Sequence, residues 1–206
     1  MKHIFITFII VASTFYCVAQ NKYEAEGDIK YENEDYAGAI IEYNKALNIA
    51  SYYSGEDTVS VSKDYTYFLR GTCKLYTEDF TGAIIDLTKS LKNCPHNVNN
   101  FFIYGNRMIK FGEEYIVMKN SYSLQHSYSH IYYYRGCAKM NLKDFKGAII
   151  DFNRTINDED IKYKIFYYRG ICRLNLGLND IGCEDLRMAG ELGNTDVYEI
   201  IKERCQ

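Results

Sequence analysis

The sequence predicts an all-helical protein, an α-α superhelix (solenoid) built from repeated helix pairs. A thirteen-residue text is written three times with few changes, at residues 35–47, 79–91 and 144–156. A glycine recurs at spacings of 44, 34, 31 and 34 residues, at Gly27, Gly71, Gly105, Gly136 and Gly170. The chain has one proline and no tryptophan, and 47% of its residues are hydrophobic, which is enough for a packed core.

The first nineteen residues are expected to form a signal peptide that is cleaved after Ala19. Lys2 precedes an apolar run at residues 4–11 that is too short to span a bilayer, and residues 17–19 place small side chains before the cut. A buried first helix and an uncleaved anchor are the alternatives. Lipidation at Cys17 is disfavoured because two bulky aromatic residues precede it. We therefore expect an exported protein, periplasmic or secreted, with no membrane insertion after cleavage.

The charge of the chain indicates which classes of partner it can bind, and its compartment determines whether its cysteines can form disulfides. Removal of the leader takes away one lysine and leaves the chain acidic, so nothing favours nucleic-acid binding, which requires clustered basic residues. In an oxidising compartment disulfides are allowed among the remaining cysteines. Cys73 and Cys172 both follow a repeat glycine by two residues, and we expect them to be small buried core residues. The other four are Cys94, Cys137, Cys183 and Cys205.

Further positions recur around each glycine. Twelve residues after it stands a small residue, at Ala39, Ala83, Ala148 and Gly182. The glycine itself ends a short text in three units, Leu69-Arg-Gly71, Tyr134-Arg-Gly136 and Tyr168-Arg-Gly170. Over residues 21–194 this pattern resembles the tetratricopeptide repeat (TPR) family, whose period is near 34 residues. The resemblance implies that the small residue of the first helix meets the small residue of the second, so that the two backbones approach closely.

We expect five such units within residues 20–206. The unit boundaries are about 20–50, 64–97, 98–128, 129–162 and 163–194, followed by a cap at 195–206. A lengthened loop is expected between units one and two, and Cys94-Pro95 is expected to close unit two. In units one, two and four the Ala-Ile-Ile sequence of the second helix is expected to serve packing.

The third unit is degenerate. It keeps Gly105, but its expected second helix at residues 115–124 lacks the repeated text. Aligned with the other units from its start, the third unit has Val117 and Leu124 at the positions that carry small residues elsewhere. Aligned from its end, it has Glu114 and Ser121 at those positions.

The last residues should cover the exposed end of the solenoid. An amphipathic cap is expected from the apolar residues Val197, Ile200, Ile201 and Cys205. Cys183 lies on the last second helix against which that cap should pack, so we expect a disulfide between Cys183 and Cys205.

The sequence contains none of the common catalytic motifs, and we expect no enzyme activity, no cofactor and no metal site. His126 and His130 are four residues apart but lack further ligands at matching spacing, and Cys94-Pro95-His96 is a weak nucleophile candidate in a turn. Arginines before the glycines and acids fifteen or sixteen residues later recur too regularly to form one active site. We expect structural ion pairs among Arg70, Arg135, Arg169, Asp86, Asp151 and Asp185.

The family resemblance also implies where a ligand would bind. In TPR proteins the first helices line a concave groove, and residues three before the glycine and one after it face the ligand. By that resemblance the groove would contain Phe68, Phe102, Tyr133, Tyr167, Thr72, Asn106, Cys137 and Ile171, with Tyr65 and His130 six before their glycines. An aromatic, weakly charged groove suits an extended peptide or a helix. The alternative is that these residues pack between repeats.

The expected function is therefore a non-enzymatic scaffold or adaptor that binds a protein or peptide in the cell envelope or outside the cell. The alternative is a structural component of an envelope complex that acts through self-association or convex-face contacts. A carbohydrate-binding protein or an enzyme is a third class.

Overall fold

The computed structural model describes residues 22–52, 63–92, 107–111, 114–118 and 128–205. The expected leader, the expected loop between units one and two, and the turn at Cys94-Pro95 lie outside these residues. Phe102, Asn106 and His126 also lie outside them.

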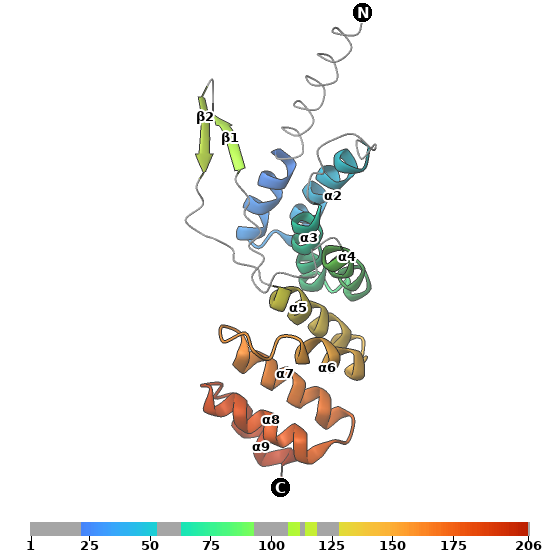
Figure 1. The fold of residues 1–206 in the computed structure, drawn as a ribbon, viewed down its shortest axis with the longest axis vertical. Coiled ribbons are helices and arrows are strands. Elements are labelled where there is room, and N and C mark those ends of the chain that lie inside the picture. The colour runs from blue at the N-terminus through green and yellow to red at the C-terminus, as the bar shows by residue number, and fades with distance from the viewer. Residues whose placement is uncertain (1–21, 53–62, 93–106, 112–113, 119–127, 206) are drawn as a thin grey trace, which may run out of the picture.

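The described helices form four antiparallel pairs and a cap, which follow one another along the long axis of the molecule (Figure 1). This confirms the expected all-α superhelix. The first pair consists of the helical segment 22–32 and α2. The bounds are α2 Tyr36–Tyr52, α3 Asp64–Tyr76, α4 Phe80–Lys92, α5 Tyr128–Asn141, α6 Phe145–Asn153, α7 Lys162–Asn175, α8 Asn179–Glu191 and α9 Val197–Arg204.

The repeated text Asp-x-x-Gly caps the second helix of three pairs. The carboxylate of Asp144 accepts a hydrogen bond from the backbone N–H of Gly147 at 2.9 Å, which satisfies one of the unpaired donors at the start of α6. A Cβ atom on Gly147 would collide with that carboxylate, so only glycine fits. The same bond joins Asp35 to Gly38 and Asp79 to Gly82.

The repeat glycines allow the two helices of a pair to approach, though in some pairs their partner differs from the expectation. A Cβ atom on Gly136 would lie 2.6 Å from the ring of Phe152, and one on Gly71 would lie 2.9 Å from Leu87. In these two pairs the glycine therefore accommodates a large side chain of the second helix, whereas a Cβ atom on Gly170 would lie 3.0 Å from the backbone of Gly182, the small residue that was expected. In the first two cases the expected small partner, Ala83 or Ala148, is fully buried beside the glycine.

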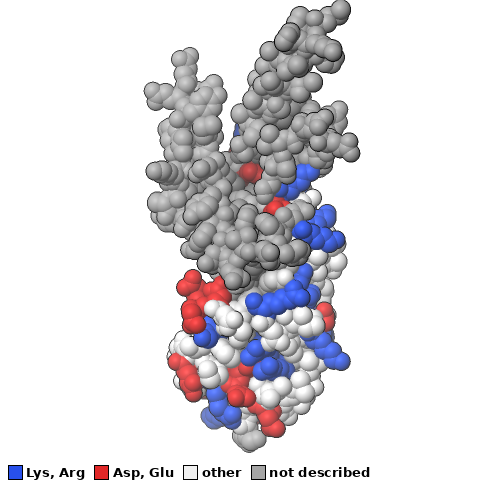
Figure 2. Space-filling view, in the orientation of Figure 1, with Lys and Arg blue, Asp and Glu red and all other residues white. Residues whose placement is uncertain are grey.

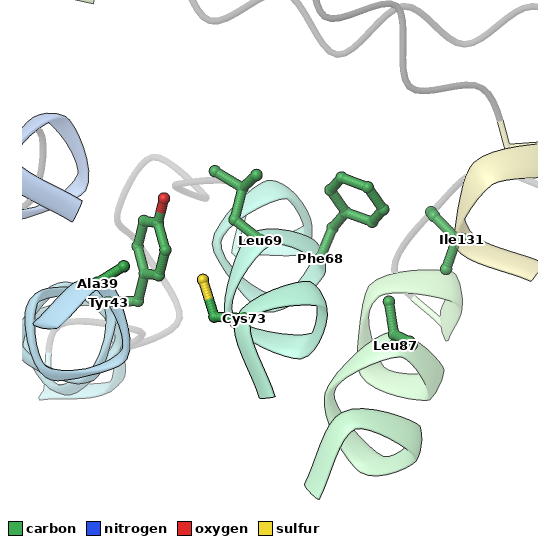
Figure 3. Close-up of a cluster of buried hydrophobic side chains, with 7 residues drawn as sticks. All are labelled: Ala39, Tyr43, Phe68, Leu69, Cys73, Leu87 and Ile131. Atoms are coloured by element: carbon green, nitrogen blue, oxygen red, sulfur yellow. The ribbon is translucent and has the colours of Figure 1, made fainter. Parts of the chain in front are cut away.

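The core runs between pairs as well as within them. In Figure 3, Leu69 and Cys73 lie on the side of α3 that faces Tyr43 of α2, and Phe68 points toward Ile131 of α5. Cys73 and Cys172 are fully buried, as expected from their shared register.

A buried ion cluster recurs in three pairs and confirms the expected structural ion pairs. Arg135 donates from Nε and Nη2 to the two carboxylate oxygens of Asp151, at 2.9 and 2.7 Å, and Lys139 Nζ lies 2.8 Å from the same group. Asp151 is fully buried, so both cations are needed to offset its desolvation. The equivalent clusters are Arg70, Lys74 and Asp86 in α3 and α4, and Arg169, Arg173 and Asp185 in α7 and α8.

Of the third expected unit the structure describes residues 107–111, 114–118 and 128, and the first two of these segments are not helical. The α4 helix packs directly against α5, although residues 93–127 separate them in the chain. Within that segment the expected helix at 115–124 is wrong over residues 115–118. They belong to β2 (Glu114–Met118), which pairs antiparallel with β1 (Arg107–Phe111) so that Ile109 opposes Ile116.

The C-terminal cap is present. Val197 of α9 is fully buried, and Ile200, Ile201 and Cys205 pack against the same cluster on α8. The expected disulfide joins Cys183 of α8 to Cys205. The last apolar face of the solenoid is therefore covered and covalently fastened.

Candidate functional site

Three residues expected to line a groove are buried. Phe68 and Thr72 have exposed fractions of 1% and 0%, and the Thr72 hydroxyl donates to the Phe68 carbonyl oxygen at 3.0 Å. Cys137 is also buried and belongs to the core of the third described pair. These three side chains pack between repeats, so the groove assignment is wrong for them.

The other five described candidates keep part of their surface in solvent. They are Tyr65, His130, Tyr133, Tyr167 and Ile171, which we call the first-helix surface. Each comes from α3, α5 or α7, and four of the five also pack against a core cluster. These residues therefore combine a packing role with a face that a ligand can contact.

Ring contacts connect this surface into one aromatic row across three pairs. The ring centroids of Phe68 and Tyr134 are 5.9 Å apart, and those of Tyr133 and Tyr134 are 5.1 Å apart. Tyr168 then lies 6.0 Å from Tyr133 and 5.0 Å from Tyr167. Such tilted and edge-on pairs are favourable geometries for aromatic rings. These ring contacts hold the aromatic side chains in place in the absence of a ligand.

Tyr134 and Tyr168, which link the row, were missed as site residues. Both stand two residues before a repeat glycine, in the text Tyr-Arg-Gly. That shared register was visible in the sequence, but it did not show that the rings would bridge their neighbours. Tyr76, which stacks on Tyr36 at 4.5 Å and is 48% exposed, was missed as well.

Burial determines the protonation of these groups. It raises the pKa of Tyr133 and of Tyr134 far above the ordinary value of a phenol, so both hydroxyls remain protonated and can donate hydrogen bonds. Burial lowers the pKa of His130 even though Asp158, 4.0 Å away, and Asp160 act in the opposite direction. His130 is therefore neutral at pH 7.

The three described free cysteines are buried and are not activated as nucleophiles. Burial raises the pKa of the Cys73, Cys137 and Cys172 thiols to about 12, so these thiols are protonated at neutral pH. Among the described residues no group of three or more His, Cys, Asp or Glu side chains could hold a metal ion. In the described helices there is also no stretch long and apolar enough to cross a membrane.

The second helices carry an exposed feature that sequence reasoning assigned to packing. In the Ala-Ile-Ile text the alanine is buried and the first isoleucine is partly buried. The second isoleucine faces solvent: Ile41, Ile85 and Ile150 are 54%, 50% and 57% exposed. The expectation that all of this text serves packing is therefore wrong for its last residue.

Comparisons with known proteins support the fold alone. No family model matches the sequence, and no curated protein matches it. Among solved structures, the chain is similar to YrrB, described as a TPR protein with an unusual peptide-binding site, with a TM-score of 0.61 and 14% identity over 96% of this chain and 85% of that one. It is also similar to MamA, with a TM-score of 0.55 and 17% identity over 81% of this chain and 74% of that one. For the apo form of RapI the TM-score is 0.60, with 14% identity over 90% of this chain and 60% of that one.

Proposed function

Because the chain has a tetratricopeptide-repeat fold, we propose that it is a non-enzymatic scaffold that binds a protein or peptide through its first-helix surface. The aromatic row carries this proposal. It offers partly exposed rings, held in place by one another, that can bury apolar side chains of a ligand. Peptide binding by YrrB supports the same use of the fold.

The test uses a displayed peptide library, because the ligand is not identified. Peptides selected on the purified protein would be titrated against Tyr167→Ser and Ile171→Ser, whose side chains lie on α7 in the first-helix surface. We expect the affinity to fall by roughly tenfold or more in each, as for central interface residues. The matched control is Leu142→Ser, an exposed apolar residue in the turn after α5 that belongs to neither the first-helix surface nor the second helices, and it should leave the affinity unchanged. Unchanged affinity in both α7 variants with retained helical circular dichroism contradicts the proposal.

We also propose that the protein works outside the cytoplasm, in the periplasm or beyond the cell. The leader-like residues 1–19 support this location, as does the Cys183–Cys205 disulfide, because such bonds persist mainly in oxidising compartments. Intact-mass measurement of the protein from its native source should give a chain that begins at Gln20. A chain that retains residue 1 in the cytoplasmic fraction contradicts it.

A second candidate function is assembly with copies of itself or with a larger envelope complex. The exposed isoleucines on the second helices favour it, since repeated apolar exposure on one face often marks an interaction surface. Sedimentation velocity separates the two functions. A monomer at all concentrations favours the scaffold, and a concentration-dependent oligomer that Ile85→Ser abolishes favours assembly.

A further inference from the structure

The second helices of the first three described pairs present the same two side chains to solvent. Ile41, Ile85 and Ile150 stand in one register, and a cation follows each by four residues, at Lys45, Lys89 and Arg154. Residues four apart lie on one face of a helix, so each isoleucine has a cation one turn away. We call these six residues the outer ridge.

Aromatic rings hold two of these cations in place. The Lys89 ammonium lies 5.1 Å from the ring centre of Tyr67, and the Arg154 guanidinium lies 4.9 Å from that of Tyr132. Arg154 also donates a hydrogen bond to the Tyr132 hydroxyl at 2.7 Å. Contacts of this kind restrict where a long side chain places its charge. The cations of the ridge are therefore positioned rather than freely mobile.

The exposed charges of α2, α4 and α6 are all positive, although the whole chain has a net charge of −3. Every acidic residue in these helices is buried and paired: Glu42 with Lys30 and with Lys45 of the ridge itself, Asp86 with Arg70, and Asp151 with Arg135. Lys and Arg accordingly predominate along the side of the molecule that α2, α4 and α6 form (Figures 1 and 2).

The pattern ends at α8. Glu184 stands in the register of the isoleucine and Met188 in that of the cation, and Asp180 and Glu191 are exposed on the same helix. The ridge is thus limited to three successive second helices with an acidic helix beyond it.

We propose that the outer ridge is a docking surface for an acidic segment of a partner protein, one whose carboxylates alternate with apolar side chains. The carboxylates would pair with Lys89 and Arg154, whereas Lys45 is already paired with Glu42, and the apolar side chains would cover the three isoleucines. This surface is distinct from the first-helix surface and does not depend on it.

Two other occupants fit less well. An anionic membrane would meet α8 together with the ridge, and the exposed acids of α8 would be repelled. A second copy packed ridge to ridge in antiparallel fashion would place α4 opposite its own copy, where Lys89 would face Lys89 and the like charges would oppose each other. An acidic partner meets neither obstacle.

The test titrates a labelled synthetic helical peptide, with leucines at i, i+3 and i+4 and glutamates elsewhere, into the purified protein. We expect binding that weakens with added salt and is lost when the glutamates are replaced by lysines. The double variant Lys89→Glu with Arg154→Glu should weaken it by roughly tenfold or more, as should Ile85→Ser with Ile150→Ser. Arg187→Glu, an exposed cation on α8, is the matched control and should change nothing.

Several outcomes overturn the proposal. One is the absence of binding at millimolar peptide. Another is equal binding by the glutamate and lysine peptides, or by the ridge variants and Arg187→Glu. Cosedimentation with vesicles containing anionic lipid that the ridge variants abolish would assign the ridge to a membrane. Self-association that Ile85→Ser abolishes would assign it to a second copy.

Discussion

Arg135 of α5 donates a hydrogen bond from Nη1 to the Thr88 hydroxyl of α4 at 3.1 Å. The same nitrogen of Arg70 reaches Asn44 at 2.6 Å, and that of Arg169 reaches Asn153 at 2.7 Å. Each acceptor occupies the same register on the second helix of the preceding pair. The α4 and α5 helices are therefore related as adjacent repeats, even though residues 93–127 lie between them in the chain.

Replacement of Arg135 by alanine should destabilise the protein strongly. It removes the bond to Thr88 and the two bonds to Asp151, and leaves that fully buried carboxylate with Lys139 alone. Loss of one partner of a buried ion pair typically costs about 3–5 kcal/mol. We expect the free energy of unfolding in urea to fall by about 3 kcal/mol. The control is Arg154→Ala, an exposed arginine on the neighbouring helix end, which should cost less than about 1 kcal/mol. Equal losses of unfolding free energy in Arg135→Ala and Arg154→Ala would show that the buried ion cluster stabilises the protein no more than an exposed arginine does.

Replacement of Lys143 by glycine should stabilise the protein. Lys143 has a φ of 62°, in the left-handed region that disfavours a side chain, whereas the equivalent residue in the last pair is already Gly177. Relief of this strain, less the greater chain entropy of glycine when unfolded, should add about 0.5–1 kcal/mol to the free energy of unfolding. Lys146→Gly, within α6, should instead reduce it by about 1 kcal/mol. A loss of stability in Lys143→Gly refutes this reading of the turn.

Reduction of the Cys183–Cys205 disulfide should loosen the cap. The bond closes a segment with a sequence separation of 22, for which the chain-entropy relation gives a stabilisation of about 3 kcal/mol. The urea midpoint of the native protein should therefore fall on addition of a reductant, while that of Cys205→Ser should not. An unchanged midpoint in the native protein would mean that the cap is held by Val197 and its neighbours alone.

The three described free thiols should resist alkylation in the folded protein. Because burial raises the pKa of Cys73, Cys137 and Cys172 to about 12, almost no thiolate is present at pH 8. Peptide mapping after iodoacetamide treatment should find these three unmodified in buffer and modified in concentrated urea. Rapid modification of any one in buffer would reopen the question of a reactive cysteine.

The helix pairs and the buried ion clusters could be predicted because their side chains recur at a fixed spacing. Asp151, for example, could be assigned to a structural ion pair from its repetition alone. The C-terminal cap and its disulfide could be predicted because the last helix has an apolar face and a cysteine that should pack against Cys183. Periodicity also led to a wrong expectation: Gly105 falls near the 34-residue period, but the residues that follow it include the strands β1 and β2. A short segment such as residues 107–111 can form either a helix or a strand. Only its pairing with a second extended segment shows that it is a strand.

The surface was harder to predict than the core. Register identified the residues on the first helices, but it could not show that Phe68 and Thr72 are covered by their neighbours or that Tyr134 joins the ring contacts. Such coverage depends on how far one pair is rotated against the next, and a spacing pattern contains no information about that rotation. For the same reason Ile41, Ile85 and Ile150 were expected in the core, although they face solvent.

The central claim is that four helix pairs form one continuous stack into which residues 93–127 are inserted. It is tested most directly by replacing residues 93–127 with a copy of residues 158–161, which join the equivalent positions of α6 and α7 and restore the 34-residue spacing between Gly71 and Gly136. The account predicts undiminished mean residue helicity, one cooperative urea transition and a free energy of unfolding within about 1 kcal/mol of the parent, since α4 and α5 keep their contacts and the connection between them is shortened. Two separate transitions, or a loss of more than about 3 kcal/mol, would contradict it.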